Sequence, residues 1–127
     1  MTLQPIQTEK APAAIGPYSQ AVVAAPFVFV SGQLGMSPAT GELVGKDLES
    51  QARQALENVK QILTAAGSSL EQTTAVDVFL TDMGDFLAFN AVYAEFFSAH
   101  KPARAAIEVS ALPKGGCVEI KCTALVA

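Results

Sequence analysis

Two predicted strands of this chain are apolar on both of their faces, and that property limits the folds open to it. In the segment 27–32, Phe27 and Phe29 alternate with Val28 and Val30, so each face of the strand is apolar. The segment 73–81, TTAVDVFLT, is rich in β-branched and aromatic residues, and both of its faces are largely apolar. A strand of this kind needs an apolar cover on both sides. The chain therefore requires a sheet with a packing partner on each face.

The clearest helix lies in KDLESQARQALENVKQILTAAG, residues 46–67. Its apolar residues recur at steps of three and four, the spacing of one helix face: Leu48, Ala52, Leu56, Val59 and Leu63. Asp47 is a suitable N-cap, and Gly67 follows the last turn as the C′ residue. We expect charged and amide residues to occupy the opposite face, where Arg53 and Glu57 form an i,i+4 pair.

A second helix is predicted in DFLAFNAVYAEFFSAH, residues 85–100, with Asp82 or Asp85 as its cap. Its aromatic residues form a stripe at helical spacing: Phe86, Phe89, Tyr93, Phe96 and Phe97. A stripe with this spacing is typical of a helix that packs on a sheet. We therefore assign it to the core rather than to a cofactor site.

The order of the elements predicts an α+β fold in a single domain, residues 1–127. Further strands are expected at about 18–24, 104–109 and 117–126, with room for an N-terminal strand in TLQPIQT. Two helices of this length cover one face of a sheet of about four to six strands. Because a monomer tolerates little exposed apolar surface, we expect an oligomer that buries the second face.

Composition argues against several classes of function. The net charge is −4 and there is no basic cluster, which disfavours nucleic acid as a partner. No apolar run approaches the roughly 18 residues of a membrane span. The N-terminus lacks the pattern of a secretory signal, so we expect a cytoplasmic protein with no membrane partner. Cys117 and Cys122 point to opposite strand faces and lie too far apart to bridge, and His100 is the one histidine, so no zinc site is expected.

Arg104 is the unusual residue of the sequence, because it places a permanent charge inside the apolar stretch KPARAAIEVSALP. In the strand 104–109 it shares a face with Ala106 and Glu108. The opposite face is apolar and is expected to meet the helices: Ala105, Ile107 and Val109. Arg104 would then face a neighbouring subunit, on the same side as Glu119 of the last strand if the two strands are neighbours.

Two interpretations of Arg104 remain open from the sequence pattern. It can form a structural ion pair with Glu108 or Glu119 across an interface, since interfaces are enriched in arginine. Alternatively, its planar fork of donors can bind a small carboxylate in bidentate fashion, in a cleft at that interface.

Several ordered stretches of the chain resemble the RidA family, the reactive intermediate/imine deaminases, along nearly its whole length. The matching stretches are APAAIGPYSQA, VSGQLG, QARQALENVKQILTAAG, FNAVYAEFF and PARAAIEVSALPKGGCVEIKCTALV. In the last of them, P-A-R followed by A-L-P and then V-E-I is similar to the family signature. The resemblance implies a chorismate-mutase-like fold, a mixed β-sheet with two helices packed on one face. It also implies a homotrimer whose sheets form a central barrel, with three clefts between subunits.

The resemblance further implies hydrolytic deamination of 2-imino and enamine acids, such as 2-iminobutyrate and 2-iminopropanoate, to 2-oxo acids and ammonia. It implies no cofactor and no metal. In this interpretation Arg104 binds the substrate carboxylate and Glu119 activates the attacking water. Tyr18 and Ser31 form hydrogen bonds near the imine nitrogen and the water. The remaining expected site positions are Asn90, which orders the cleft, and the backbone amides near Gly32 and Ala106.

Each of these residues also has an ordinary structural interpretation, for example Glu119 as the surface partner of Lys121 or Lys114. One position departs from the family pattern: many members carry a cysteine where this chain has Ala106, so no thiol can act there. Other functions compete with deamination. One is a non-catalytic small-carboxylate sensor or protein-holding module on the same trimer. The less favoured one is RNA cleavage or translational inhibition.

Overall fold

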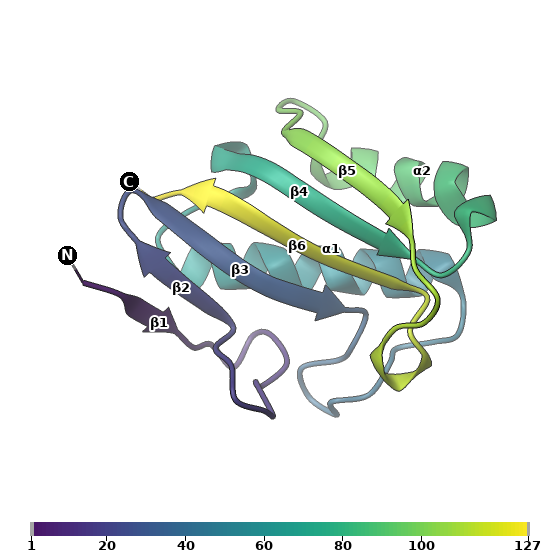
Figure 1. The fold of residues 1–127 in the computed structure, drawn as a ribbon, viewed down its shortest axis with the longest axis horizontal. Helices are drawn as coiled ribbons and strands as arrows, with labels where there is room; N and C mark the ends of the chain where they lie inside the picture. The colour runs from purple at the N-terminus through teal and green to yellow at the C-terminus, as the bar shows by residue number, and fades with distance from the viewer. Residues whose placement is uncertain (1, 127) are drawn as a thin grey trace.

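The strands form one mixed sheet in the order β1-β2-β3-β6-β4-β5 (Figure 1). A computed structural model describes residues 2–126. The strands are β1 (Gln4–Ile6), β2 (Ala21–Ala24), β3 (Phe27–Leu34), β4 (Thr73–Leu80), β5 (Ala103–Glu108) and β6 (Val118–Leu125). β4 and β5 pair in parallel, whereas the other neighbouring strands pair antiparallel. The α+β class, with a mixed sheet, is therefore as predicted.

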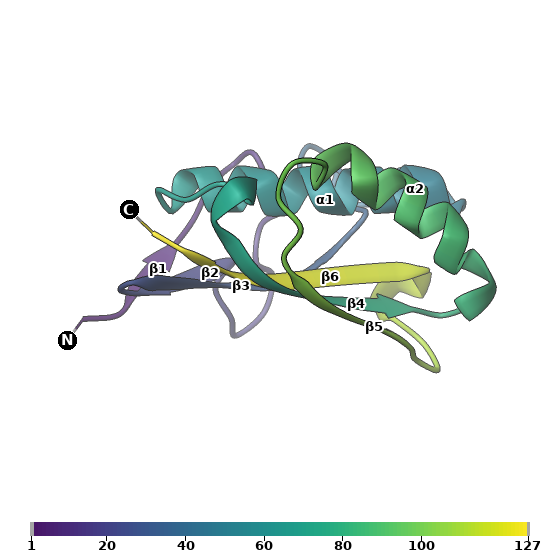
Figure 2. The same ribbon diagram turned by 90° about the horizontal axis from the view of Figure 1, so that it is seen from above.

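Both helices, α1 (Leu48–Ala65) and α2 (Phe86–Phe96), cover the same face of this sheet (Figure 2). α1 packs on β3 and β6 and against α2. Single 3₁₀ turns at Leu70–Gln72, Met83–Asp85 and Pro113–Gly115 connect the main elements. Within residues 2–126, neither helix is long and apolar enough to cross a membrane.

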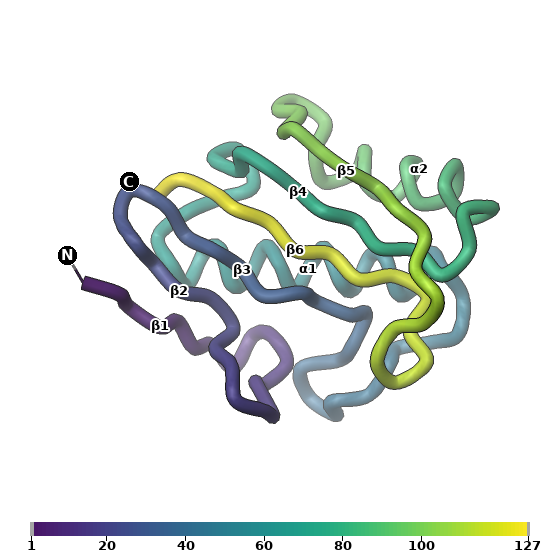
Figure 3. Tube along the Cα trace, viewed as in Figure 1, coloured from purple at the N-terminus to yellow at the C-terminus, as the bar shows by residue number. Residues whose placement is uncertain are grey.

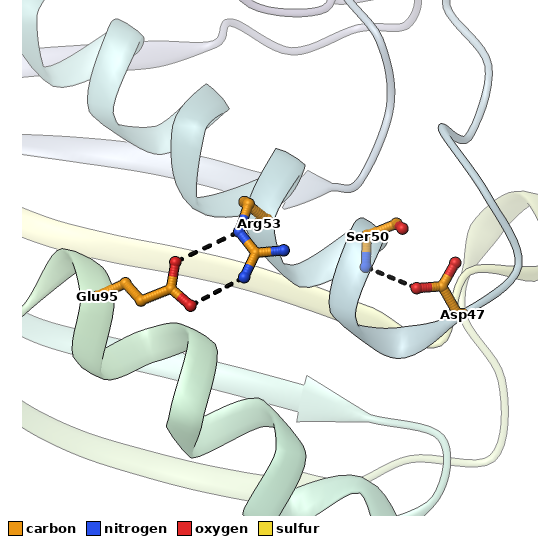
Figure 4. A network of polar contacts seen from close by, with 4 residues as sticks. All are labelled: Asp47, Ser50, Arg53 and Glu95. Carbon is orange, nitrogen blue, oxygen red and sulfur yellow. Dashed lines mark hydrogen bonds and ion pairs between the residues drawn. The ribbon is translucent and has the colours of Figure 1, made fainter.

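The ends of α1 follow the predicted capping. The carboxylate of Asp47 accepts a hydrogen bond from the backbone amide of Ser50 at 2.9 Å (Figure 4). That bond holds the pKa of Asp47 below its ordinary value. At the other end Gly67 has a φ of +80°, and the amide of Ser68 donates to the carbonyl of Leu63 at 2.8 Å. A glycine at C′ permits this left-handed closure of the last turn.

The predicted Arg53–Glu57 pair is wrong, because Arg53 reaches across to the other helix. Its Nη2 and Nε lie 2.8 and 3.4 Å from the two carboxylate oxygens of Glu95 in α2 (Figure 4). Glu57 instead accepts a hydrogen bond from Gln61. Tertiary packing brings a better bidentate partner within reach than the next helical turn offers.

The expectation that amide side chains lie on the outer face of α1 is also wrong for Gln51 and Asn58, which are buried. Asn58 Nδ2 donates to the carbonyls of Leu34 and Met36 at 3.2 and 2.9 Å, where β3 ends. Gln51 donates to the carbonyl of Gly45, and its Oε1 accepts from the Cys117 amide, both at 2.9 Å. These two amides hold the loops that follow β3 and precede β6, whose backbone groups would otherwise be buried without partners.

α2 presents its aromatic stripe to the core as predicted, with Phe89 and Phe97 buried and the remaining aromatic rings packed against the same cluster. The helix is shorter than the expected 85–100. Asp85, one of the two predicted caps, occupies the N-cap position but makes no side-chain capping bond, and Asp82 instead caps the preceding 3₁₀ turn, where it accepts from the amide of Gly84 at 2.8 Å.

The second face of the sheet has no cover within residues 2–126 (Figure 2). On β6, alternate residues from Val118 to Ala124 are buried against the helices, as expected. The opposite face carries apolar side chains that are 38–51% exposed: Phe27, Phe29, Ile107 and Leu125. The oligomer expected to bury this face remains a prediction.

Candidate active site

A cleft of about 330 Å³ lies beside the C-terminal end of β3. Three connecting segments gather along this side of the sheet: 7–20, 35–47 and 109–117 (Figure 3). The residues lining the cleft are Pro12, Ala13, Ile15, Tyr18, Gln20, Gly32, Gln33, Leu34, Met36, Pro113, Lys114 and Glu119. Tyr18, Gly32 and Glu119 were all predicted site residues, and the fold brings them together here.

A β-bulge in β3 shapes the floor of this cleft. Val30 pairs with Cys122 and Gln33 with Ile120, so Ser31 and Gly32 together oppose one residue of β6. The bulge reverses the alternation of β3. After the bulge, Leu34 therefore lies on the uncovered face together with its partner on β6. Before the bulge, Phe29 lies on that same face with its own partner. Bulges of this kind re-aim side chains and are over-represented next to active sites.

Gly32 permits the Glu119 carboxylate to lie directly over the β3 backbone. A Cβ on Gly32 would sit 2.9 Å from the Cδ atom of Glu119 and would overlap one of its carboxylate oxygens. No larger residue fits at this position without moving Glu119. The glycine is therefore required by the close approach of a side chain rather than by a positive φ.

Glu119 lies on the uncovered face between Leu34 of β3 and Phe79 of β4. Burial among these neighbours raises the pKa of the Glu119 carboxyl above its ordinary value. Neither Lys121 nor Lys114 forms an ion pair with it, and Arg53–Glu95 is the one ion pair among residues 2–126. The surface-charge interpretation of Glu119 is therefore not supported within the chain, and its carboxylate is available to a ligand or a water.

Tyr18 lines the cleft, whereas Ser31, beside Gly32 in β3, is not among its lining residues. Ser31 Oγ donates to the carbonyl of Ser19 at 2.6 Å, and its amide donates to the carbonyl of Gln20 at 2.9 Å. Tyr18 follows a tight turn closed by its own amide and the carbonyl of Gly16. The Tyr18 side chain is 52% exposed, so its hydroxyl can reach a bound molecule.

The prediction that Arg104 faces a neighbouring subunit is wrong. Its side chain lies on the face of the sheet that the helices cover. In the parallel β4–β5 ladder Arg104 is level with Val76 and Ala106 with Val78, and both valines are buried in the core. Residues level with one another point to the same face of a sheet. Ala106 packs on that core, while Ile107 is exposed on the opposite face.

The Arg104 guanidinium is held by α2. Its Nη1 donates to Asn90 Oδ1 at 2.8 Å. Its Cζ lies 4.8 Å from the ring centre of Tyr93, 5.6 Å from that of Phe86 and 5.9 Å from that of Phe89. Glu108, an expected ionic partner, instead accepts from the amide of Met83 at 2.8 Å. No ion pair of Arg104 with Glu108 or Glu119 forms within residues 2–126.

The predicted site residues thus fall into two separate groups within one chain. Tyr18, Gly32 and Glu119 line the cleft and Ser31 is the chain neighbour of Gly32, whereas Arg104, Asn90 and Ala106 lie on the helix side at the β5 edge. The assumption that the strands of Arg104 and Glu119 are neighbours is wrong, because β4 lies between them. The two charged side chains also project from opposite faces of the sheet.

Sequence reasoning missed the buried side chain of Gln20. It donates to the carbonyls of Pro12 and Thr8 at 2.8 and 3.0 Å and accepts from the amide of Thr8 at 2.7 Å. These bonds fix the segment that forms one wall of the cleft. The alternation of apolar and polar residues gives no signal for Gln20. For Gln51 and Asn58 a signal did exist, since they share the helix face of Ala55 and Ile62.

Residues 2–126 contain no group of three His, Cys, Asp or Glu side chains placed to hold a metal ion. The polar groups that line the cleft include the desolvated Glu119 carboxylate, the Tyr18 hydroxyl and the Lys114 ammonium.

A family model described as Endoribonuclease L-PSP matches residues 8–126. The chain belongs to this family. The finding bears out the resemblance to RidA proteins, since one solved member is RidA from the Antarctic bacterium Psychrobacter sp. PAMC 21119. That RidA structure is 50% identical in sequence to the chain, superposes with a TM-score of 0.93, and the match covers 97% of this chain and 99% of the other.

Two further RidA-family relatives are similar over almost the same length. A RutC family protein from Pyrococcus horikoshii is 54% identical over 119 residues, which is 94% of each chain. A protein from Capra hircus named 2-iminobutanoate/2-iminopropanoate deaminase is 52% identical over 120 residues, covering 94% of this chain and 88% of that protein.

Proposed function

We propose that this RidA-family chain is a 2-iminobutyrate/2-iminopropanoate deaminase, a hydrolase acting on C=N bonds at clefts between the subunits of a homotrimer. The observation that carries the proposal is the Glu119 carboxylate, which is partly desolvated, has a raised pKa and lies over Gly32 at the cleft without an ionic partner. Relatives that are about half identical to the chain and bear the name of this activity support it.

The proposed homotrimer brings together a base and a guanidinium that lie apart in one chain. The cleft has a base and the Tyr18 hydroxyl, and the Lys114 ammonium on its lining donates to the carbonyl of Gly41 at 3.4 Å, whereas Arg104 has a free guanidinium edge but no base. Burial of the exposed Phe29 and Ile107 side chains against neighbouring sheets would stabilise a closed assembly. In this arrangement Arg104 of one subunit faces the Glu119 cleft of the next.

The reaction is hydrolysis. Glu119 takes a proton from a water whose oxygen attacks the imine carbon, and a tetrahedral aminoalcohol forms. That first proton passes to the nitrogen as the aminoalcohol forms; Glu119 then takes the hydroxyl proton and delivers it to the nitrogen as the C=O bond forms and the C–N bond breaks, which gives a 2-oxo acid and ammonia. A carboxylate whose pKa is raised toward neutrality is a better proton acceptor and donor than an ordinary surface glutamate.

The other residues hold and orient the 2-imino acid. Arg104 binds its carboxylate through the guanidinium edge that Asn90 leaves free. Tyr18 and Ser31 form hydrogen bonds to the nitrogen and the water. Backbone amides near Gly32 and Ala106 contribute further donors. Since imines already hydrolyse in water, orientation and one base account for the acceleration without a cofactor.

The test pairs turnover with binding in Glu119→Gln. Imine is generated from threonine by a dehydratase, and its loss is followed in competition with semicarbazide. We expect turnover to fall about 10²- to 10⁴-fold, the usual contribution of a general base. Binding of 2-oxobutyrate, measured by calorimetry, should persist because Arg104 is unchanged.

Three outcomes separate this proposal from its competitors. Unchanged turnover in Glu119→Gln would exclude Glu119 as the base. A wild-type protein that binds 2-oxobutyrate but does not accelerate imine loss would be a sensor of small carboxylates. Cleavage of a labelled RNA at low salt, with no effect on imines, would favour the nuclease activity, against which the net charge of −4 argues.

A further inference from the structure

We propose that Tyr93 is a positioning residue that, with Asn90, holds Arg104 in an uncharged cradle, so that the guanidinium keeps its full charge for the carboxylate of the ligand. The inference rests on the proposed function in so far as the ligand is a 2-imino or 2-oxo acid. It goes beyond that function by assigning a role to a side chain that touches no substrate.

The geometry of the cradle is specific. The Tyr93 ring centre is the nearest of three aromatic centres to Arg104 Cζ, at 4.8 Å. Tyr93 is fixed in turn by its neighbours on α2, with ring centres 5.6 Å from Phe89 and 4.7 Å from Phe97. A cation over a ring face is attracted by the negative face of the π system. The ring therefore stabilises the guanidinium without supplying a hydrogen-bond acceptor that would occupy its edge.

The Arg104 guanidinium is not neutralised by an acidic side chain among residues 2–126. Arg104 has no carboxylate partner among residues 2–126, and the nearby Glu108 is engaged by the amide of Met83. A partly buried arginine ordinarily pairs with an acid, and such a pair neutralises the charge. Here one N–H bonds to the neutral Asn90 amide. The other guanidinium N–H groups remain available to an anion.

The environment of the Tyr93 hydroxyl supports a role for the ring rather than for the oxygen. Burial raises the pKa of Tyr93 to about 12, although the charge of Arg104 acts in the opposite direction. The hydroxyl is buried and has no hydrogen-bond partner within residues 2–126. The phenol is therefore neutral at physiological pH, and its face is the part that serves Arg104.

The deciding experiment introduces a counter-ion. Asn90→Asp keeps the shape of the side chain but places a carboxylate where the Oδ1 atom lies 2.8 Å from Arg104 Nη1. We expect 2-oxobutyrate to bind about 10- to 100-fold more weakly, because a charge-assisted partner now competes for the fork. The unfolding temperature should stay equal or rise, since the new pair is attractive. If Asn90 only supported the fold, the Asn90→Asp variant would not bind 2-oxobutyrate more weakly while its unfolding temperature stayed equal or rose.

Ala91→Asp is the matched control. It adds the same charge at the adjacent, exposed position of α2. Its affinity for 2-oxobutyrate should stay within about twofold of the wild type, because an exposed charge is screened. Loss of affinity in both variants to the same extent would mean that general repulsion, and not occupation of the guanidinium, weakens binding.

A second series tests Tyr93. Tyr93→Leu removes the ring and should weaken 2-oxobutyrate binding about 2- to 30-fold, the range expected for a cation–π contact. KM should rise by a similar factor, with a smaller change in kcat. Tyr93→Phe keeps the ring face and should recover most of that loss. Phe96→Leu, on the same helix but outside the Arg104 contacts, controls for lost aromatic volume.

The results that overturn the cradle differ from those that overturn the proposed function. If wild-type protein binds 2-oxobutyrate and hydrolyses imines but Asn90→Asp and Tyr93→Leu bind as well as wild type, the cradle is wrong and the function stands. If the wild type itself neither binds nor turns over, the function fails. If Tyr93→Phe is as impaired as Tyr93→Leu, the hydroxyl and not the ring matters, and the assignment to the ring is wrong.

Discussion

Arg104 and Glu119 project from opposite faces of one sheet, with β4 between their strands. Arg104 is level with the buried Val76, and Glu119 is paired with Phe79 on the uncovered face. A small 2-imino acid cannot touch both side chains of a single chain. If both residues act on one molecule, the two must come from different subunits.

We therefore expect two inactive variants to complement each other. Arg104→Lys keeps the charge but loses the bidentate fork, and Glu119→Gln loses the base, so each homotrimer should be nearly inactive. In a cyclic trimer every mixed assembly contains one intact site of three. Equal amounts refolded together should recover roughly 25% of wild-type activity. Imine loss before and after joint refolding measures this.

The matching control is to mix the two variants without refolding, which should leave them inactive over the time of the assay. If mixed trimers form but activity does not recover, the prediction of a shared site is wrong. Either both residues then act within one subunit, or one of them does not belong to the site.

The uncovered sheet face predicts the oligomeric state. Sedimentation at micromolar concentration should give a mass of about three times 13.2 kDa. Ile107→Glu places a charge on this face, where the side chain is 51% exposed in the single chain, and should yield a folded monomer without activity. Thr64→Glu, on the exposed side of α1, should remain trimeric. An active monomer of the wild type would contradict the shared cleft.

Gly32→Ala tests the close approach of the Glu119 carboxylate. The added methyl group would overlap that carboxylate, so Glu119 must move. We expect a loss of about 1–3 kcal/mol in the free energy of unfolding, as for other overpacked sites, and a large loss of turnover. Chemical denaturation and the imine assay measure the two effects.

Gly67→Ala separates stability from activity. Gly67 follows the end of α1 with a φ of +80°, and a Cβ added to it would meet open space. Its substitution should cost about 1 kcal/mol of stability but leave turnover intact. Equal turnover losses in both variants would mean that lost stability alone explains the effect at Gly32.

The raised pKa of Glu119 has a consequence for stability. The folded chain binds this proton more tightly than the unfolded chain, whose carboxyl keeps a value near 4.5. The stabilisation by protonation is fully present below pH 4.5 and is lost as the pH rises through the folded-state pKa. At neutral pH the wild type therefore carries the cost of a desolvated carboxylate.

Glu119→Gln removes that cost. The variant should unfold at a higher temperature than the wild type at neutral pH, and the difference should shrink toward zero as the pH falls below 4.5. Thermal unfolding at several pH values measures it. A difference independent of pH would show that the gain comes from altered packing instead of the removed charge.

The sequence by itself determined the parts of the fold that depend on local periodicity and on short-range capping. The apolar spacing of α1, its Asp47 cap and its Gly67 terminus were all predictable, because each depends on residues within one or two turns. The helix-facing residues of β6 were predictable for a similar reason, since one of its two alternating sets is wholly apolar. The family signature also identified the candidate site residues in their order along the chain.

Only the tertiary structure decided which of these residues meet. Both alternating sets of β5 contain apolar residues, so its orientation depends on the register with β4, which turns Arg104 toward the α2 rings. The bulge at Ser31 and Gly32 likewise depends on pairing with β6. The roles of Gln51 and Asn58 depend on loop carbonyls far away in the sequence. Periodicity reports the faces of one element, but register and burial depend on contacts between elements, and those contacts divided the candidate site into two halves.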